Sequence, residues 1–451
     1  MTGRALAVKG MAIAAAVLLA GGCAAAGGPA DQRMEQRPAD RPGSAEHSDP
    51  GQHKGRLPAE QAQREQGSAD PGSAHPGAVF DGNAAGAGAS DADSRRADPS
   101  EAGAAQRITA AEDAPGAGAP AVPDGVRGIY VSGWIAGSKE PMERLIRLVD
   151  ETDLNAMVID VKNDYGRLTY RSSLPEVQAV GADREPPVRD MAGLLRRLKA
   201  KRIYTIGRIV VFKDPLLARA KPEWAFHTKS GALWRDQKGQ PWVEPYHPEV
   251  RAYNIAIAKE AAALGFDEIQ FDYVRFPDNG EKMDRVVRYR NPEGWTKREA
   301  IGRFLREARD ALRPSGTALS ADVFGLVTTA RDDMGIGQTW REIAPAVDVI
   351  SPMVYPSHYA AGTYGIRHPD LKPSAVVRHA LDDAAKRNRV LSAEGKRPGQ
   401  IRPWLQAFTA SWLRPHQTYR AEEVREQILA AEAAGVRQFL LWNPSCTYEY
   451  R

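Results

Sequence analysis

Apolar and polar positions alternate in two different rhythms from residue 126 onward. Short runs with a period of two predict eight strands, at 127–134, 156–164, 204–212, 268–276, 318–326, 347–356, 403–408 and 438–443. Apolar residues spaced by three or four predict amphipathic helices between them, at 141–152, 188–201, 248–264, 297–312, 376–387 and 421–434. Only 339–346 predicts no more than a short helix before the next strand. The alternation predicts an α/β protein, a (β/α)8 TIM barrel over residues 125–451.

An open, doubly wound sheet is the competing fold for such an alternation. That fold often carries a glycine-rich phosphate turn after its first strand. Here the first predicted strand runs into Ser132-Gly133-Trp134, which does not match that turn. The barrel is therefore the favoured fold.

Composition changes sharply before the first strand. Residues 24–124 consist largely of Ala, Gly, Pro, Asp, Ser, Gln and Arg, and Phe80 is their one aromatic residue. Such a segment buries too little apolar surface to offset the entropy of ordering, so we expect a long disordered linker. It would serve as a tether, although sequence under no structural constraint would have the same composition.

The first 23 residues resemble an export signal. Arg4 and Lys9 precede an apolar run at 11–20, which is too short for a typical membrane-spanning helix. The run ends in Leu19-Ala-Gly-Gly-Cys23, which resembles a bacterial lipobox stretched by one glycine. We expect a signal peptide at 1–23, lipidation at Cys23 and an exported protein anchored to the cell-envelope membrane. Simple secretion and an uncleaved anchor are the alternatives.

Charge and cysteine content exclude several classes of function. A net charge of +4 over 451 residues, without a dense Lys/Arg cluster, gives no indication of a nucleic-acid partner. The two cysteines, Cys23 and Cys446, cannot form a disulfide framework or a cysteine zinc site, and we expect Cys446 to be a buried thiol. The histidines lack metal-ligand spacing, and Ser320 lacks the glycines of a nucleophile elbow. We therefore expect no cofactor and no metal.

The fourth predicted strand ends in a carboxylate. Within 266–277, Ile269, Phe271 and Tyr273 form an apolar face, and Gln270 and Asp272 lie on the other. A carboxylate at the end of a buried strand is costly unless it is bonded, paired or used. Pairing with Arg275 would be a purely structural explanation. However, Arg275 is an odd number of positions from Asp272 and so points to the opposite face of the strand. We therefore expect it to brace a loop.

Other predicted strands end in the same way. Active sites of TIM barrels lie at the carboxyl ends of the strands, where we expect these side chains to share one cavity. In strand order they are Trp134; Asp160, Lys162 and Asp164; Arg208; Gln270, Asp272 and Arg275; Ser320 and Asp322; Ser351, Met353 and Tyr355; Gln406; and Trp442 and Asn443. The alternative is an ion-pair network that merely closes the barrel.

Two neighbouring carboxylates suit glycoside hydrolysis, in which one attacks or activates water and the other protonates the leaving oxygen. We predict Asp272 as the nucleophile and Asp322 as the acid, with Asp160 as the other candidate acid. Because Asp272 and Asp322 lie on neighbouring predicted strands, we expect their carboxyl groups to be closer to the separation of about 5–5.5 Å that is typical of retaining glycosidases than to the wider separation of inverting ones. The predicted substrate-binding residues are Trp134, Lys162, Arg208, Gln270, Tyr355, Gln406 and Trp442. The loop at 213–247 adds aromatic residues that suit sugar rings or a small loop core.

Four motifs resemble a bacterial glycoside hydrolase family that was first described as a domain of unknown function. They are Gly128-Ile-Tyr-Val-Ser-Gly-Trp134, Val158-Ile-Asp-Val-Lys-Asn-Asp164, Trp242-Val-Glu-Pro-Tyr-His-Pro-Glu-Val250 and Phe266-Asp-Glu-Ile-Gln-Phe-Asp-Tyr-Val-Arg-Phe-Pro277. The family is similar at a distance to the alpha-amylase clan of (β/α)8 barrels. The resemblance implies a catalytic barrel acting on a polysaccharide, with Asp272 as the nucleophile.

This sequence departs from that clan in two places. The strand-five acid is a glutamate in the clan, where this chain has Asp322, and the strand-seven His-Asp pair is replaced by Gln406-Ala-Phe408. A standard amylase is therefore not expected. Two hypotheses follow, an exported glycoside hydrolase and a catalytically inactive barrel that binds envelope glycan.

Overall fold

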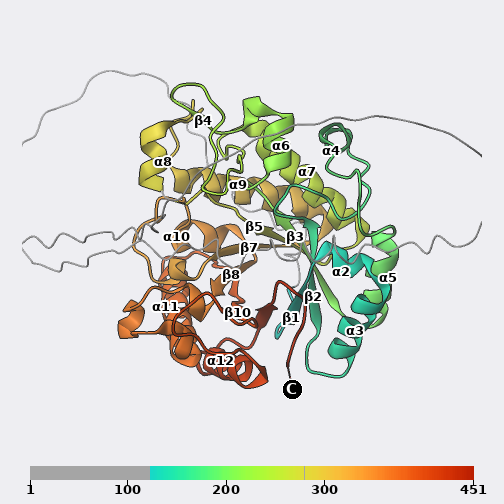
Figure 1. Cartoon of the computed structure of the whole chain (residues 1–451), viewed down its shortest axis with the longest axis vertical. Helices are drawn as coiled ribbons and strands as arrows, with labels where there is room; N and C mark the ends of the chain where they lie inside the picture. Colours follow the sequence, from blue (N-terminus) through green and yellow to red (C-terminus); the bar gives the residue numbers. More distant parts are fainter. Residues whose placement is uncertain (1–121, 279, 451) are drawn as a thin grey trace, which may run out of the picture. The chain divides into compact units, whose positions relative to one another are not determined.

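Eight parallel strands form a closed barrel in the computed structural model, which describes residues 122–278 and 280–450 (Figure 1). In chain order the barrel strands are β1 (Arg127–Val131), β2 (Ala156–Lys162), β3 (Tyr204–Val210), β5 (Glu268–Asp272), β7 (Ala318–Phe324), β8 (Val349–Val354), β10 (Trp404–Gln406) and β11 (Phe439–Trp442). Pairing of β10 with both β8 and β11, and of β11 with β1, closes the ring. The predicted (β/α)8 fold is confirmed.

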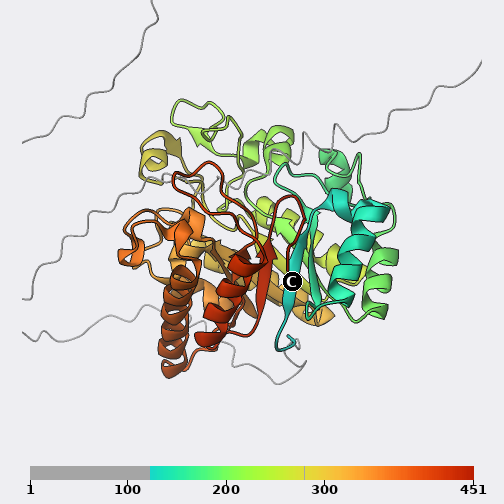
Figure 2. The ribbon, with the colours of Figure 1, turned by 60° about the horizontal axis from the view of Figure 1, so that its bottom comes forward.

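Helices surround the barrel and fill the connections between its strands (Figure 2). They are α2 (Gly133–Gly137), α3 (Lys139–Asp150), α4 (Pro175–Val180), α5 (Met191–Ala200), α6 (Pro215–Ala220), α7 (Pro248–Leu264), α8 (Gly280–Val286), α9 (Lys297–Leu312), α10 (Trp340–Ile343), α11 (Pro373–Ala393) and α12 (Ala421–Ala433). The connection before β8 holds the short helix α10 between two 3-10 helices, at Gly325–Thr328 and Ala344–Ala346, and the short helix agrees with the prediction. Two small pairs complete the sheets: β4 (His227–Thr228) with β6 (Val287–Arg288), and β9 (Gln400–Ile401) with β8.

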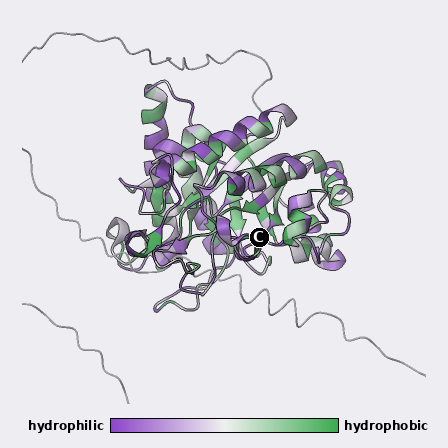
Figure 3. Ribbon diagram, turned by 90° about the horizontal axis from the view of Figure 1, so that it is seen from above, coloured by the Kyte–Doolittle hydropathy of each residue, from purple (hydrophilic) through white to green (hydrophobic). Residues whose placement is uncertain are grey.

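Apolar side chains on the outer faces of the strands pack against the helices. Ile209, Ile269 and Phe271 have no exposed surface, and the Phe271 ring lies 4.9 Å from that of Phe304 on α9. Each such side chain contributes about 1.5–3 kcal/mol through burial. Green, hydrophobic strands therefore occupy the middle of Figure 3, with mixed helices around them.

All eight barrel strands end one to four residues earlier than predicted, and the two largest differences, at β1 and β5, have local reasons. β1 stops at Val131 because the Ser132 hydroxyl accepts a hydrogen bond from the Ile135 amide and caps α2, which places Trp134 on a helix. β5 stops at Asp272 because Tyr273 adopts a positive φ of 50°, which ends the alternation. The prediction that Tyr273 continues the apolar face of that strand is therefore wrong.

A bulge in β2 reverses one predicted orientation. Asp160 is in register with Arg208, but Lys162 is in register with Ile209, so β2 has one extra residue over this interval. Lys162 consequently faces the helices, where its ammonium donates to Asp214 and to Asn254 of α7, both at 2.7 Å. The prediction that Lys162 shares the cavity with the carboxylates is wrong.

A charged pair is buried inside the barrel, deeper than Asp272. Arg402 donates at 2.9 Å to both oxygens of Glu268, two residues before Gln270 on β5, and neither side chain is exposed. Arg402 also donates to Gln438 at 3.0 Å, and its Nη2 has no hydrogen-bond partner among the residues that the structure describes. The pair is balanced in charge and sealed from solvent.

Several predictions concern residues outside the part of the chain that the structure describes. They are the signal segment 1–23, lipidation of Cys23 and nearly all of the linker at 24–124. Among the described residues, no helix combines the length and apolar character needed to span a bilayer. Cys446 is buried, and burial raises the pKa of its thiol to about 12.

Removing one member of the balanced pair should destabilise the barrel. We expect Glu268→Gln to lower the free energy of unfolding by about 3 kcal/mol, because it leaves the Arg402 cation buried without a counter-charge. Urea unfolding followed by circular dichroism measures this loss. The double variant Glu268→Gln/Arg402→Gln should recover part of it, and purely additive losses would contradict this account.

Candidate active site

The Arg208 guanidinium links three carboxylates inside the barrel. Its Nε and Nη2 donate to Asp272 Oδ2 at 3.0 and 2.7 Å, its Nη1 donates to Asp160 Oδ1 at 2.7 Å, and its Nη2 also reaches Asp164 Oδ1 at 3.2 Å. Arg208 is 3% exposed, so these bonds form away from bulk water. Burial opposes its charge, but the three carboxylates more than offset burial and raise the pKa of Arg208 further.

Asp272 has both oxygens engaged by donors that favour its ionised form. Arg208 donates to Oδ2, and the backbone N–H of Tyr273 donates to Oδ1 at 2.6 Å. The left-handed backbone of Tyr273 turns that N–H back toward the preceding side chain. Arg275 takes no part, because it donates to the Phe276 carbonyl and pairs with Asp278, and it thus braces the loop as predicted.

Asp322 lies beside Asp272 but has a different environment. The two follow Phe271 and Ala321, which are in register on the neighbouring strands β5 and β7. Trp404 Nε1 donates to Asp322 Oδ1 at 2.8 Å, and no cation among the described residues contacts this carboxylate. Burial and, next, the charge of Asp272 raise the pKa of Asp322 well above its usual range. The pair therefore contains one carboxylate bonded to a cation and one carboxyl group whose surroundings favour the protonated form.

Asp160 is the more constrained of the two predicted acids. Its Oδ1 accepts from Arg208 and its Oδ2 accepts from the Tyr130 hydroxyl at 2.6 Å, so both oxygens are occupied. Burial raises its pKa against the opposing effect of Arg208. Asp160 is better placed to orient Arg208 than to donate a proton.

Aromatic rings border the carboxylate group. The Trp442 ring lies 5.3 Å from the Arg208 guanidinium and 4.2 Å from the Tyr130 ring. Tyr355 is buried, and after burial the charges of Asp322 and Asp272 are the largest influences that raise the pKa of its hydroxyl. The structure thus brings together five predicted residues, which are Asp160, Arg208, Asp272, Asp322 and Trp442, with Tyr355 beside them.

Four predicted substrate-binding residues lie elsewhere. Lys162 faces α7, and Trp134 lies on α2 with 40% of its surface exposed. Gln270 is fully buried one layer deeper, where it donates to Ser351 at 3.2 Å. Gln406 accepts from the Ser357 amide and hydroxyl and donates to the Phe408 carbonyl, so it fastens the loops after β8 and β10.

Two residues of the site were not predicted. Tyr130 and Trp404 point into the barrel from β1 and β10, and each donates to a carboxylate. Their inward parity was readable from the strand pattern. The sequence prediction rests on residues near the carboxyl ends of the strands, and an aromatic donor earlier in a strand carries no comparable signal.

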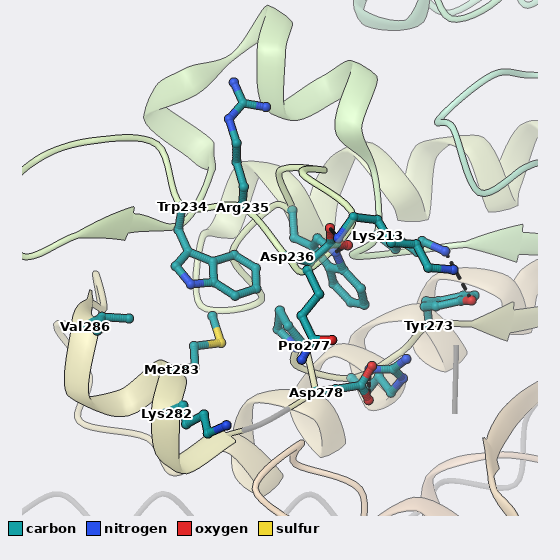
Figure 4. Close-up of a pocket in the computed structure, with 14 residues that line it drawn as sticks. Lys213, Trp234, Arg235, Asp236, Tyr273, Pro277, Asp278, Lys282, Met283 and Val286 are labelled. Atoms are coloured by element: carbon teal, nitrogen blue, oxygen red, sulfur yellow. Dashed lines mark hydrogen bonds and ion pairs between the residues drawn. The ribbon is translucent and has the colours of Figure 1, made fainter. Parts of the chain in front are cut away.

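A cavity of about 320 Å³ is lined by Tyr273, the residue that follows Asp272 (Figure 4). The connections after β3 and β5 form it, and Tyr273 and Lys213 belong to its wall. Of the predicted loop aromatics, Phe226, Trp242 and Tyr246 are buried, Phe226 and Tyr246 against Phe276, whereas Trp234 is half-buried and lines the cavity. The loop therefore has both a small core and an aromatic wall.

Within the described ranges, no three His, Cys, Asp or Glu side chains are grouped so that they could hold a metal ion.

Comparisons with known proteins agree with this architecture. A family model, DUF4015, described as a putative glycosyl hydrolase domain, matches residues 128–448. No curated protein matches the chain.

Solved structures also match. A hypothetical protein from Ruminiclostridium thermocellum is 38% identical over 46% of this chain and 98% of its own, with a TM-score of 0.40. The PgaB (BpsB) glycoside hydrolase domain from Bordetella bronchiseptica is 15% identical over 71% of this chain and 94% of its own, with a TM-score of 0.50. This second likeness supports the fold.

The raised pKa of Asp322 predicts a pH-dependent stability cost. An unfolded aspartate titrates near pH 3.9, so above that pH the unfolded state loses a proton that the folded state keeps. Stability contributed by this group is therefore full below about pH 4 and declines as pH rises toward the folded pKa. Asp322→Asn should remove the decline and have a higher free energy of unfolding than the parent protein at pH 7.

Urea unfolding at several pH values between 4 and 8 measures this difference. The gap between Asp322→Asn and the parent should widen as pH rises. Asp310→Asn, at an exposed position on α9, is the matched control and should show no such trend. A gap that is constant with pH would contradict the protonated state of Asp322.

Proposed function

The chain belongs to this glycosyl hydrolase family, and from that premise we propose that it cleaves a polysaccharide with Asp272 and Asp322 as its two catalytic carboxylates. Its substrate is a carbohydrate. The proposed division of labour has Asp272 acting as the ionised partner and Asp322 as the acid that protonates the leaving oxygen.

The observation that carries this proposal is the contrast between two adjacent carboxyl groups. Hydrogen bonds from Arg208 and the Tyr273 amide favour ionised Asp272, whereas burial and the neighbouring negative charge keep the proton on Asp322. Glycoside hydrolysis requires one group in each state at the same pH. Their positions on adjacent strands favour the short separation of retaining enzymes, with Asp272 as the nucleophile.

The neighbouring groups have supporting roles in this proposal. Asp160 and Tyr130 hold the Arg208 guanidinium in place, so that it remains aimed at Asp272 Oδ2. Trp404 fixes Oδ1 of Asp322, which leaves Oδ2 to carry the proton toward the substrate. Trp442 and Tyr355 supply aromatic surface for a sugar ring beside the reacting bond.

We further propose that the enzyme is exported and anchored to the membrane of the cell envelope through a lipid on Cys23. The sequence supports this through the basic start, the apolar run at 11–20 and the lipobox-like Leu19-Ala-Gly-Gly-Cys23. The segment at 24–124 would then act as the tether between the anchor and the barrel.

Neutralising either carboxylate should abolish turnover. We expect Asp272→Asn and Asp322→Asn each to lower kcat by about 10³-fold or more, because each removes one essential role in the reaction. Release of reducing ends from a panel of envelope and extracellular polysaccharides measures turnover. Asp310→Asn is the control variant, and thermal melts should show that all three proteins fold.

The same assay separates the enzyme from a catalytically inactive glycan-binding barrel. The inactive-barrel hypothesis is favoured by the hydrogen bonds that already occupy both Asp272 oxygens. It predicts saturable glycan binding and no release of reducing ends. Full activity in folded Asp272→Asn would refute the proposed mechanism.

Replacing the proposed lipidation site should release the protein from membranes. We expect Cys23→Ser to move the protein from the detergent-soluble membrane fraction to the aqueous fraction, because a lipid chain is then missing. Cell fractionation with immunoblotting measures the shift, and Cys446→Ser serves as the control. Equal partitioning of Cys23→Ser and the parent protein would rule out the anchor.

A further inference from the structure

The cavity beside the carboxylate group collects positive charge along its wall. Its described lining includes Lys213, Lys238, Arg275 and Lys282. A fifth cationic residue, Arg235, extends away from the other labelled side chains in Figure 4. Two lining carboxylates, Asp236 and Asp278, oppose the four remaining cations, which leaves a surplus of two positive charges.

Both lining carboxylates are already committed to local partners. Asp236 accepts from Trp242 Nε1 and from the amides of Lys238 and Gln240, all at 2.9 Å, so it shapes its own turn. Asp278 pairs with Arg275 at 3.2 Å. Both carboxylates therefore have partners of their own.

Cations are held close together where the cavity meets the carboxylate group. Lys213 Nζ donates to the Tyr273 hydroxyl at 3.3 Å and lies 3.8 Å from Asp164, the carboxylate that Arg208 also contacts. The charge of Arg275 acts against that of Lys213, and the charges of Lys213 and Lys238 both act on Asp164. Gathering like charges costs energy, and Asp164 offsets part of that cost at Lys213.

The opposite wall of the cavity is apolar. Figure 4 shows Lys213 and Tyr273 on one side and Trp234, Met283 and Val286 on the other. An aromatic ring suits the face of a sugar, and the facing cations suit a substituent with negative charge. The volume of about 320 Å³ lies at the lower end of the range for ligand pockets.

The cavity and the catalytic group have one residue in common, Tyr273. The Tyr273 amide donates to Asp272, and Tyr273 also lines the cavity. Tyr273 therefore links the wall of the cavity to the proposed catalytic group.

We propose that this cavity is a subsite for a negatively charged sugar residue, so that the substrate of the enzyme is an acidic glycan. This inference rests on the proposed function, because it takes the glycan to extend from Asp272 and Asp322 past Tyr273 into the cavity. The charged group is a carboxylate or a phosphate, because lysine and arginine recognise both.

Binding to matched glycans tests the subsite without requiring turnover. The protein is full-length Asp322→Asn, and the carboxylate probes are hexamers from polygalacturonate and from hyaluronate. Their carboxyl-reduced counterparts are the neutral probes, and a glycerol phosphate polymer bearing sugars is the phosphate probe. Isothermal titration calorimetry at 50 and 300 mM salt gives the Kd values. At least one anionic probe should bind about tenfold or more tightly than the neutral probes at low salt, and this preference should shrink at high salt.

Single substitutions locate the effect in the cavity. Lys213→Gln and Lys282→Gln should each raise the Kd for the preferred anionic probe by about tenfold or less, because each removes one charge-assisted contact. Neither should change binding of neutral probes. Lys229→Gln, an exposed position in the same connection but outside the cavity, is the matched control.

The outcomes separate the subsite from the proposed function. No binding to any of the anionic probes, equal binding of anionic and neutral probes, or equal loss in Lys229→Gln would overturn the subsite, even where the parent enzyme hydrolyses a glycan. Charge-dependent binding in the cavity without release of reducing ends from any probe by the parent enzyme would overturn the hydrolase proposal and leave the subsite standing. Preference for the carboxylate or the phosphate probe identifies the charged group.

Discussion

The arrangement of the site depends on one buried cation, Arg208. Three carboxylates, Asp160, Asp164 and Asp272, accept from its guanidinium, and Tyr130 completes the hydrogen bonding of Asp160. Removing water from these ions costs several kcal/mol each, and only good geometry compensates for that cost. Asp322 receives no hydrogen bond from this cation, and the charge of Arg208 acts on it less strongly than that of Asp272. The same barrel opening thus contains one carboxylate that is bonded to a cation and one that is not, and the position of Arg208 distinguishes them.

The backbone of Tyr273 connects this electrostatic group to the surface that would receive a glycan. Its positive φ ends β5, turns its N–H back to Asp272 and places its side chain in the wall of the cavity. A regular strand would have pointed the Tyr273 side chain toward the helices. Strained backbone of this kind is usually maintained by its surroundings, and here Lys213 and Arg275 both lie against the ring.

Much of this could be predicted from the sequence. All eight barrel strands and the six longer helices lie where the apolar periodicity predicts them, and the inward parity of Asp160, Arg208, Asp272 and Asp322 follows from the alternation along strands. The predicted orientation of Lys162 is wrong because a bulge adds one residue to β2, and no residue in this stretch indicates a bulge. Gln406 was assigned to substrate because its loop partner Ser357, 49 positions away, is adjacent only in the fold. Trp404 was missed for the same reason, since its carboxylate partner is 82 positions away.

The barrel interior itself supplies the comparison that distinguishes a structural charge from a functional one. Deep in the barrel, Glu268 and Arg402 form a closed pair in which each charge has its counter-charge and neither is exposed. At the carboxyl ends of the strands, Asp322 is buried with no ion pair to a cation among the described residues, and the charge that acts on it most strongly is that of another carboxylate, Asp272. An ion-pair network that only closed the barrel would repeat the balanced arrangement, because an unmatched buried acid lowers stability at neutral pH. The unmatched acid lies at the end of the barrel where TIM-barrel enzymes carry their chemistry, and there a retained proton is useful.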